Sequence, residues 1–280
     1  MYKFAHVLQR CGRGWGIVVR RTGAALACGL ALGCAVDLRP DSLASIPDAT
    51  ARSAGAERLV ESARIHGLDR WQRFTQLRFR LRDAGVARCF RGGIRPFPSP
   101  QSLDVEVAVR DGSVRVRFAD GPRQGDAVGI KGDLAYRIAD SGALEFERDA
   151  CAETYLRALQ EALVLPFRLA ILARTADVSP FAAGERTLGE KSYDLVLVTV
   201  PAPYGTSADE QYVLWIERAS GRIEWLERTD RRRSRRAHEV LHYLNYTDVN
   251  GVMLPLRIER VDAVGDSAGQ SLELTQLALD

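Results

Sequence analysis

The apolar stretch at the N-terminus is too short to form a transmembrane helix. A transmembrane helix needs about 20 apolar residues, whereas the apolar stretch behind the N-terminal basic residues, 22–33, has 12. The chain of 280 residues has only four histidines, and it contains no convincing internal repeat or low-complexity tract. With 46% hydrophobic and 27% charged residues, it is an ordinary globular chain, neither disordered nor collagen-like.

Acidic residues are absent from the first 33 positions. Five basic residues lie there: Lys3, Arg10, Arg13, Arg20 and Arg21. The formal net charge is +3 for the whole chain and therefore −2 without this segment. Because the basic character belongs to the N-terminus, the charge gives no support to a nucleic-acid partner.

The N-terminus has the layout of a secretory signal, with a basic stretch, a short apolar run and small residues. Leu30-Ala31-Leu32-Gly33-Cys34 resembles a bacterial lipoprotein signal, although Ala31 stands where Leu is usual and Cys28 is a second candidate. This resemblance implies a signal peptide over residues 1–33, a lipid attached to Cys34, and a lipid-anchored position on the periplasmic side of the outer membrane. A plain cleaved signal and a retained N-terminal anchor are the alternatives.

Residues 34–55 contain two prolines and small polar residues without a sustained period, which predicts a flexible tether. Behind it, Cys89 and Cys151 are the two remaining cysteines. In an oxidising compartment they are expected to form one disulfide, which would contribute roughly 4 kcal/mol from loop-closure entropy. Two separate buried thiols are the alternative.

The remaining chain, 56–280, reads as one domain. Helical spacing predicts helices over 56–66 and 152–165, the second ended by Pro166. Period-two alternation, often between apolar residues and arginine, predicts many strands, joined by turns such as Asn250-Gly251. The strands expected cover 77–82, 103–109, 114–118, 134–138, 193–200, 211–218, 222–228, 237–247, 252–260 and 271–279.

Strands joined by tight turns are antiparallel, and a sheet this large has to curl. The fold class predicted is therefore α+β, a curled antiparallel sheet or unclosed β-barrel with two or three helices covering its concave face. Segment 166–189, with two prolines and two glycines, is a candidate mobile flap.

Several motifs in order carry a family resemblance: Ile65-His66-Gly67 with Trp71, Leu165-Pro166-Phe167, the strand 212–216 with Ser220-Gly221, and Val249-Asn250-Gly251. Together they resemble the periplasmic lipoprotein-carrier superfamily of LolA/LolB-like proteins, including its uncharacterised outer-membrane lipoprotein-sorting members. The resemblance covers about residues 57–260. It implies a half-barrel whose hollow holds acyl chains. The carriers that shuttle freely carry no lipid anchor, so the expected anchor makes this chain more like an anchored acceptor or a lipid sensor.

An apolar half-barrel is a cavity unless side chains fill it, and such cavities take hydrophobic ligands. We therefore expect a non-enzymatic lipoprotein that binds a lipid or acyl chain noncovalently, with no cofactor. The alternative is an interaction protein whose barrel is filled and which docks an envelope complex. Expected cavity residues are Trp71, Phe79, Leu159, Leu163, Phe167, Trp215, Trp225 and Leu254; core packing is an equal explanation for the three tryptophans.

Three further motifs bear on chemistry. Ser267 lies in a Gly-x-Ser-x-Gly pattern, but no histidine follows it, so a hydrolase is a weak hypothesis. His238 and His242 lie in a strand, about 13 Å apart and too far for one metal ion. The arginine run comprises Arg231, Arg232, Arg233, Arg235 and Arg236. It is either a solvated hairpin tip or a contact to anionic headgroups.

Overall fold

The computed structural model has one large compact unit, residues 36–280. The structure describes residues 36–39, 49–83, 101–121, 123–132, 134–139, 141–146, 150–172, 178–201, 209–229, 231, 237–266 and 269–280. In these ranges no helix is long and apolar enough to cross a membrane.

The described residues form one antiparallel sheet of 13 strands, with the strand order β6-β5-β4-β3-β2-β1-β13-β12-β11-β10-β9-β8-β7. The sheet is not closed, because β6 and β7 are its edges. The strands are β1 (Gln76–Asp83), β2 (Gln101–Ala108), β3 (Val114–Phe118), β4 (Ala127–Lys131), β5 (Leu134–Ile138), β6 (Leu144–Phe146), β7 (Ser179–Leu188), β8 (Lys191–Val200), β9 (Glu210–Glu217), β10 (Ile223–Thr229), β11 (His238–Val249), β12 (Val252–Val261) and β13 (Gln270–Leu279). The predicted fold class is confirmed.

Neighbours in the sheet are neighbours in the sequence, except where β1 pairs with β13. Local turns explain most of this order. In the β11–β12 hairpin, Val249 pairs with Val252, and Asn250 and Gly251 have φ angles of 56° and 80°. Both angles are those of a type I′ turn, which matches the twist of the strands it joins. The Asn-Gly signal therefore predicted this hairpin correctly.

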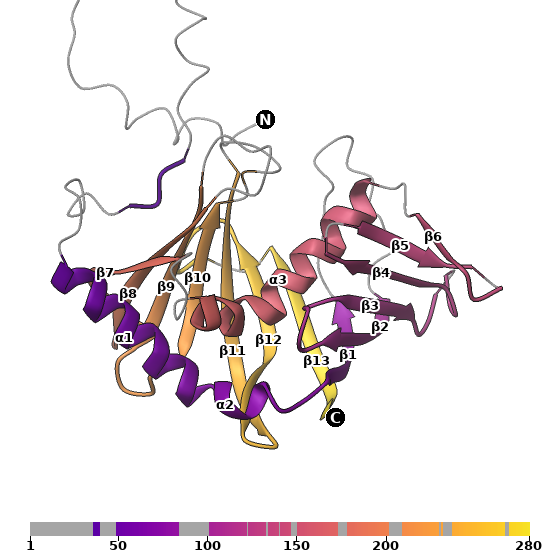
Figure 1. The fold of residues 1–280 in the computed structure, drawn as a ribbon, viewed down its shortest axis with the longest axis horizontal. Helices are drawn as coiled ribbons and strands as arrows, with labels where there is room; N and C mark the ends of the chain where they lie inside the picture. Colours follow the sequence, from indigo (N-terminus) through magenta and orange to yellow (C-terminus); the bar gives the residue numbers. More distant parts are fainter. Residues whose placement is uncertain are drawn as a thin grey trace, which may run out of the picture. The chain divides into compact units, whose positions relative to one another are not determined.

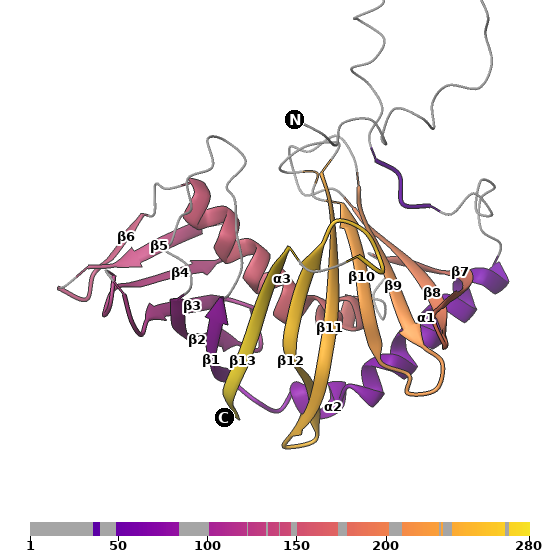
Figure 2. The ribbon, with the colours of Figure 1, turned by 180° about the vertical axis from the view of Figure 1, so that it is seen from behind.

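In the same described ranges, three helices lie on one face of the sheet: α1 (Ala49–Ile65), α2 (Leu68–Trp71) and α3 (Ala150–Leu172). Figures 1 and 2 show α3 against β10–β13 and α1 running across the β7–β9 end. Gly55 lies inside α1, where an added Cβ would come within 2.4 Å of the Phe181 carbonyl carbon. The glycine therefore permits α1 to approach β7 closely and does not end the helix.

The predicted tether, 34–55, includes two described parts that contact or belong to the folded domain. Residues 49–55 belong to α1, and Leu38 packs against side chains of the sheet. Regular structure forms in the described part of the segment predicted as a mobile flap, 166–189. Residues 166–172 continue α3, and Ser179–Leu188 forms β7, paired with β8.

Pro166 does not end its helix, contrary to the prediction. Proline cannot donate the backbone hydrogen bond that the carbonyl of Ala162, four residues earlier, would normally accept. The hydroxyl of Tyr243 on β11 donates to that carbonyl instead, at 3.0 Å. Because the sheet supplies the missing donor, the helix continues to Leu172.

Strand alternation divides the buried residues into two clusters. The larger one, which we call the inner cluster, lies between the sheet and the helices and includes Leu156, Leu214 and Leu254. The smaller one, the outer cluster, takes the alternate residues of β7–β12, among them Leu195, Val213 and Val240. The strands β7–β12 thus carry apolar residues on both faces of the sheet.

Candidate functional site

The candidate site is the space between α3 and the inner face of the sheet. Most of α3 is apolar, and the residues it buries are Ala152, Tyr155, Leu156, Leu159, Ala162, Leu163, Val164, Leu165, Phe167, Leu169 and Ala170. Such a wide apolar surface is typical of a helix enclosed by other elements. Here α3 occupies the side of the sheet where the sequence predicts a hollow.

The polar contacts between α3 and the sheet, among the residues that the structure describes, include three half-way along the helix. Besides the bond from Tyr243 to the Ala162 carbonyl, the side-chain amide of Gln160 donates to the carbonyl of Gly112 at 2.6 Å. Arg228 on β10 is 5% exposed and forms an ion pair with Glu161. We call these three contacts the latches of α3.

The cavity found between α3 and the sheet is small in the part of the chain that the structure describes. A cavity of about 20 Å³ lies between α3 and β11–β13, lined by Ala158, Ala162, Leu241 and Ile258 among others. Such a volume holds about one water molecule, whereas pockets for small ligands measure roughly 300–1,000 Å³. The inner face is therefore filled by the chain's own helix in this conformation.

Six of the eight expected cavity residues lie in the inner cluster: Trp71, Phe79, Leu159, Leu163, Phe167 and Leu254. Trp71 stacks on Phe167, with ring centroids 4.4 Å apart and planes 8° from parallel. Leu159 alone among the six lines the remaining cavity. The structure brings these residues together as packing partners.

Trp215 and Trp225 belong to the outer cluster, so the structure does not place them where we expected them. Leu214 and Ile216 on β9 belong to the inner cluster, and alternation turns Trp215 to the opposite face. Trp215 donates its indole N–H to Glu227 at 2.8 Å. Single-strand alternation could not tell which of the two apolar faces the helices would cover.

Histidines on the outer face make structural contacts. His242 stacks on Trp225, with ring centroids 3.6 Å apart, and burial lowers its pKa although Glu259 opposes the shift. Nε2 of His238 lies 3.4 Å from Glu227. Among the residues that the structure describes, no group of three His, Cys, Asp or Glu side chains is arranged to hold a metal ion.

His66, at the end of α1, is a packing residue. It is 3% exposed, its Nε2 accepts the backbone N–H of Ile223 at 3.1 Å, and Nδ1 faces the carbonyl of Met253 at 3.4 Å. Burial lowers its pKa to about 4, while the Met253 carbonyl has a smaller opposing effect. The neutral ring thus links α1 to β10 and β12 and is enclosed from solvent.

Several predicted residues lie outside the described part of the chain: Cys34, Cys89, Arg232, Arg233, Arg235, Arg236 and Ser267. Of Cys151 the structure describes only the backbone, in α3. Arg231 is described, and its guanidinium contacts the N-terminal segment through the carbonyl of Val36. This contact had no signal in the sequence, because 195 positions separate the two residues.

No protein-family model matches this chain, and no curated protein matches it. Solved structures do. A putative outer membrane lipoprotein-sorting protein domain from Vibrio parahaemolyticus has a TM-score of 0.48 and 11% identity, with 80% of this chain and 93% of that one covered. A LolA superfamily protein from Nitrosomonas europaea has a TM-score of 0.46 and 15% identity, with 73% and 85% covered. A DUF1329 family protein from Desulfovibrio piger has a TM-score of 0.40 and 12% identity, with 82% and 93% covered.

Proposed function

We propose that this protein is an envelope lipoprotein that binds a lipid or acyl chain noncovalently between α3 and the inner face of the sheet. What supports the proposal is that the contact between α3 and the concave face of the open sheet is apolar on both sides, so an acyl chain that displaces the helix meets an apolar surface. In this proposal, α3 occupies the space that the ligand would take when no ligand is bound. The protein makes and breaks no covalent bond.

Ligand entry requires α3 to separate from the sheet, and the latches set part of the cost. A neutral hydrogen bond contributes about 1 kcal/mol net. A buried methylene contributes about 0.8 kcal/mol, so a 16-carbon chain supplies on the order of 12 kcal/mol when fully buried. If the ligand inserts under the helix, the apolar side chains of α3 contact the ligand rather than water. The burial of the acyl chain then offsets the loss of the hydrogen bonds between α3 and the sheet.

The proposal includes the anchor and the compartment. A lipid on Cys34 would hold the protein at the periplasmic side of the outer membrane, where Cys89 and Cys151 would form a disulfide. Arg231, Arg232, Arg233, Arg235 and Arg236 would contact anionic headgroups, at about 1 kcal/mol for each residue near the surface. Sensing or transport of lipids or lipoproteins fits this arrangement.

Ligand binding is tested on the full chain purified from membranes. Native mass spectrometry is expected to show a noncovalent acyl species, and a fluorescent 16-carbon fatty acid is expected to bind after delipidation. Gln160→Ala removes one latch and should raise the uptake rate about fivefold, the equivalent of roughly 1 kcal/mol. Gln124→Ala, at an exposed position, should leave the rate unchanged. A protein that copurifies with no acyl species and binds no probe would contradict the proposal.

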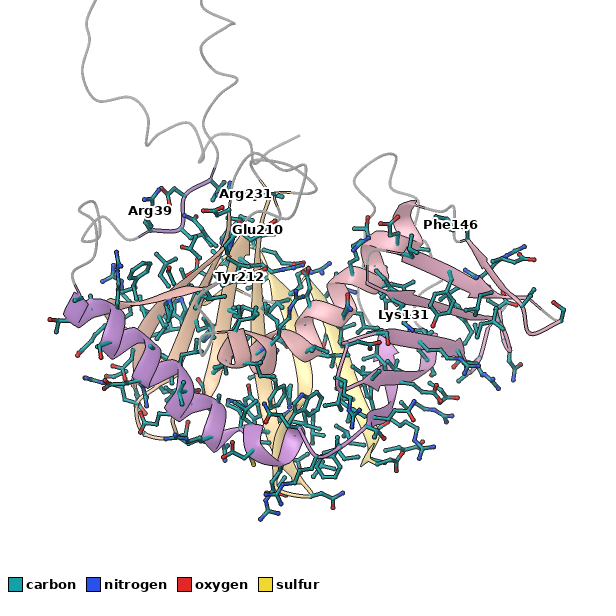
Figure 3. All side chains as sticks on the ribbon, in the orientation of Figure 1. Arg39, Lys131, Phe146, Glu210, Tyr212 and Arg231 are labelled. Carbon is teal, nitrogen blue, oxygen red and sulfur yellow. The ribbon has the colours of Figure 1, made fainter. Side chains whose placement is uncertain are left out.

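A second candidate function follows from the filled interior. The protein would then be an interaction module, and the free edge of the sheet offers a surface: Leu134, Leu144 and Phe146 on β5 and β6 are 56%, 68% and 67% exposed. Figure 3 shows Phe146 at this edge. Exposed apolar side chains gathered in one place are typical of docking surfaces. If this candidate is right, Leu144→Ser abolishes envelope complex formation, whereas Gln160→Ala does not.

A further inference from the structure

The segment directly behind Cys34 is bound to the sheet. Residues 36–39 lie at the end where β9 begins and β10 ends, and Figure 3 shows Arg39, Glu210 and Arg231 together there. The guanidinium of Arg231 donates to the carbonyl of Val36, and the N–H of Leu38 donates to Oε1 of Gln211 at 2.9 Å. The side chain of Leu38 packs against the outer cluster.

Gln211 recognises this segment with both ends of its amide. While Oε1 accepts from Leu38, Nε2 donates to Oδ1 of Asp37 at 2.8 Å. Gln211 is only 7% exposed, and its own N–H donates to the hydroxyl of Thr229 at 2.9 Å. A side chain held in this way makes its two bonds with little further loss of conformational freedom.

A buried carboxylate positions the second contact. Glu210 is 9% exposed and accepts two hydrogen bonds, from the hydroxyl of Thr229 at 2.8 Å and from the backbone N–H of Arg231 at 2.7 Å. These bonds fix the chain where it leaves β10. The Arg231 guanidinium is thereby aimed at the N-terminal segment.

We infer that this arrangement is a clamp, formed by Gln211 and Arg231, that holds the domain against the membrane in one orientation. The inference rests on the proposed lipid at Cys34. Only Ala35 separates Cys34 from Val36, and two residues span at most about 7 Å. A lipid on Cys34 would therefore be attached within about 7 Å of the clamped Val36, which in this proposal turns the end of β9 and β10 toward the phosphate headgroups.

The pairing of the strands fixes which parts face the bilayer. Thr229 pairs with His238 at the clamped end, so the connection that holds the arginine run leaves the sheet on the membrane side. The Val249–Val252 pair closes the other end of β11. The Asn250-Gly251 turn therefore points away from the bilayer.

Hydrogen exchange of the full, membrane-extracted chain tests the clamp. The Leu38 amide should exchange at least about tenfold more slowly than in the double variant Gln211→Ala/Arg231→Ala, which corresponds to about 1.4 kcal/mol. Leu38→Ser perturbs the segment without changing the sheet, and it should lose protection at residues 36–39 as well. Arg137→Ala is the matched control, because Arg137 forms an exposed ion pair with Glu145 on β5 and β6, away from the clamped end; it should keep the protection. Equal exchange of Leu38 in wild type and in both clamp variants overturns the clamp.

Neutron reflectometry on a supported bilayer with anionic lipid tests the orientation. The wild-type domain should lie directly on the headgroups. If Leu38→Ser releases residues 36–39, 15 residues join the lipid to α1. A flexible chain of this length has a root-mean-square length of about 20 Å, so a water-rich gap of that order should appear. The same gap in wild type overturns the orientation. Intact-mass analysis of Cys34 separates the proposed membrane orientation from the proposed ligand binding. A chain without lipid refutes the anchor and the orientation. Exchange of the Leu38 amide still tests the clamp in that case, and fatty-acid uptake still tests ligand binding.

Discussion

The bond between Tyr243 and the carbonyl of Ala162 predicts a specific energetic coupling between a strand and a helix. Tyr243 is 2% exposed, and its hydroxyl replaces the donor that Pro166 lacks. Tyr243→Phe leaves this carbonyl without a hydrogen-bond donor in the protein interior. The cost of a buried unsatisfied group is about 1–3 kcal/mol, and each kcal/mol lowers Tm by roughly 2–4 °C in a domain of this size.

The same reasoning predicts that a second substitution rescues the first. In Pro166→Ala, residue 166 regains an N–H four residues after Ala162, and that N–H donates to the carbonyl within the helix. Tyr243→Phe should therefore cost less in the Pro166→Ala background, with a coupling energy of at least about 1 kcal/mol.

Urea unfolding of the four proteins in this cycle, monitored by circular dichroism, measures the coupling. The control is Tyr193→Phe, since the Tyr193 hydroxyl donates to Glu224 on the outer face and has no connection with Pro166. Its cost should be the same in both backgrounds. If Tyr243→Phe also costs the same with and without Pro166, the hydroxyl does not replace the missing donor, and our explanation of the unbroken helix is wrong.

Three further predictions concern stability. His66 has a folded pKa of about 4, lowered by burial from the ordinary value of 6.5. The contribution of the neutral ring to the free energy of unfolding is therefore complete above pH 6.5 and is lost as the pH falls toward 4, by up to about 3 kcal/mol. His66→Gln should flatten the pH dependence of urea unfolding in this window, and an unchanged profile would contradict the burial of His66 as the neutral ring. Leu156→Ala, at a fully buried position in α3, should cost about 2–5 kcal/mol by thermal unfolding; a loss below about 1 kcal/mol would show that α3 does not pack as described. Gly129→Ala should cost about 1–3 kcal/mol, because its Cβ would lie 2.4 Å from the Tyr136 ring and 2.8 Å from the Val114 carbonyl; Tyr136→Ala in the same chain should recover only part of this loss, since the contact with the backbone remains.

The strands and their order could be predicted from the sequence because both depend on local chemistry. Alternation in stretches such as 77–82 is a property of neighbouring residues, and the positive φ angles of Asn250 and Gly251 suit one kind of hairpin turn. Several short or edge strands were not predicted, among them β4, β6 and β7. The two short ones give too little period to recognise, and Pro180 and Gly184 in β7 resemble loop residues.

The candidate site was predicted only in part, for a different reason. Phe167 and Leu254 could be assigned to the covered side of the sheet, but Trp215 and Trp225 could not, because both faces of their strands are apolar. Whether the concave face was hollow or filled depended on the path of α3 beyond Pro166. That path depends on a hydroxyl 81 positions further along the chain.

The sequence by itself determined the antiparallel class of this protein, its hairpins and the amphipathic helices, since each follows from residues close together along the chain. The tertiary structure alone decided that α3 fills the inner face, that the tryptophans of β9 and β10 lie on the outer face, and that the segment behind Cys34 is clamped by Gln211 and Arg231. These outcomes depend on donors, acceptors and apolar surfaces that meet only when distant segments fold together, and no local pattern encodes which of them will meet.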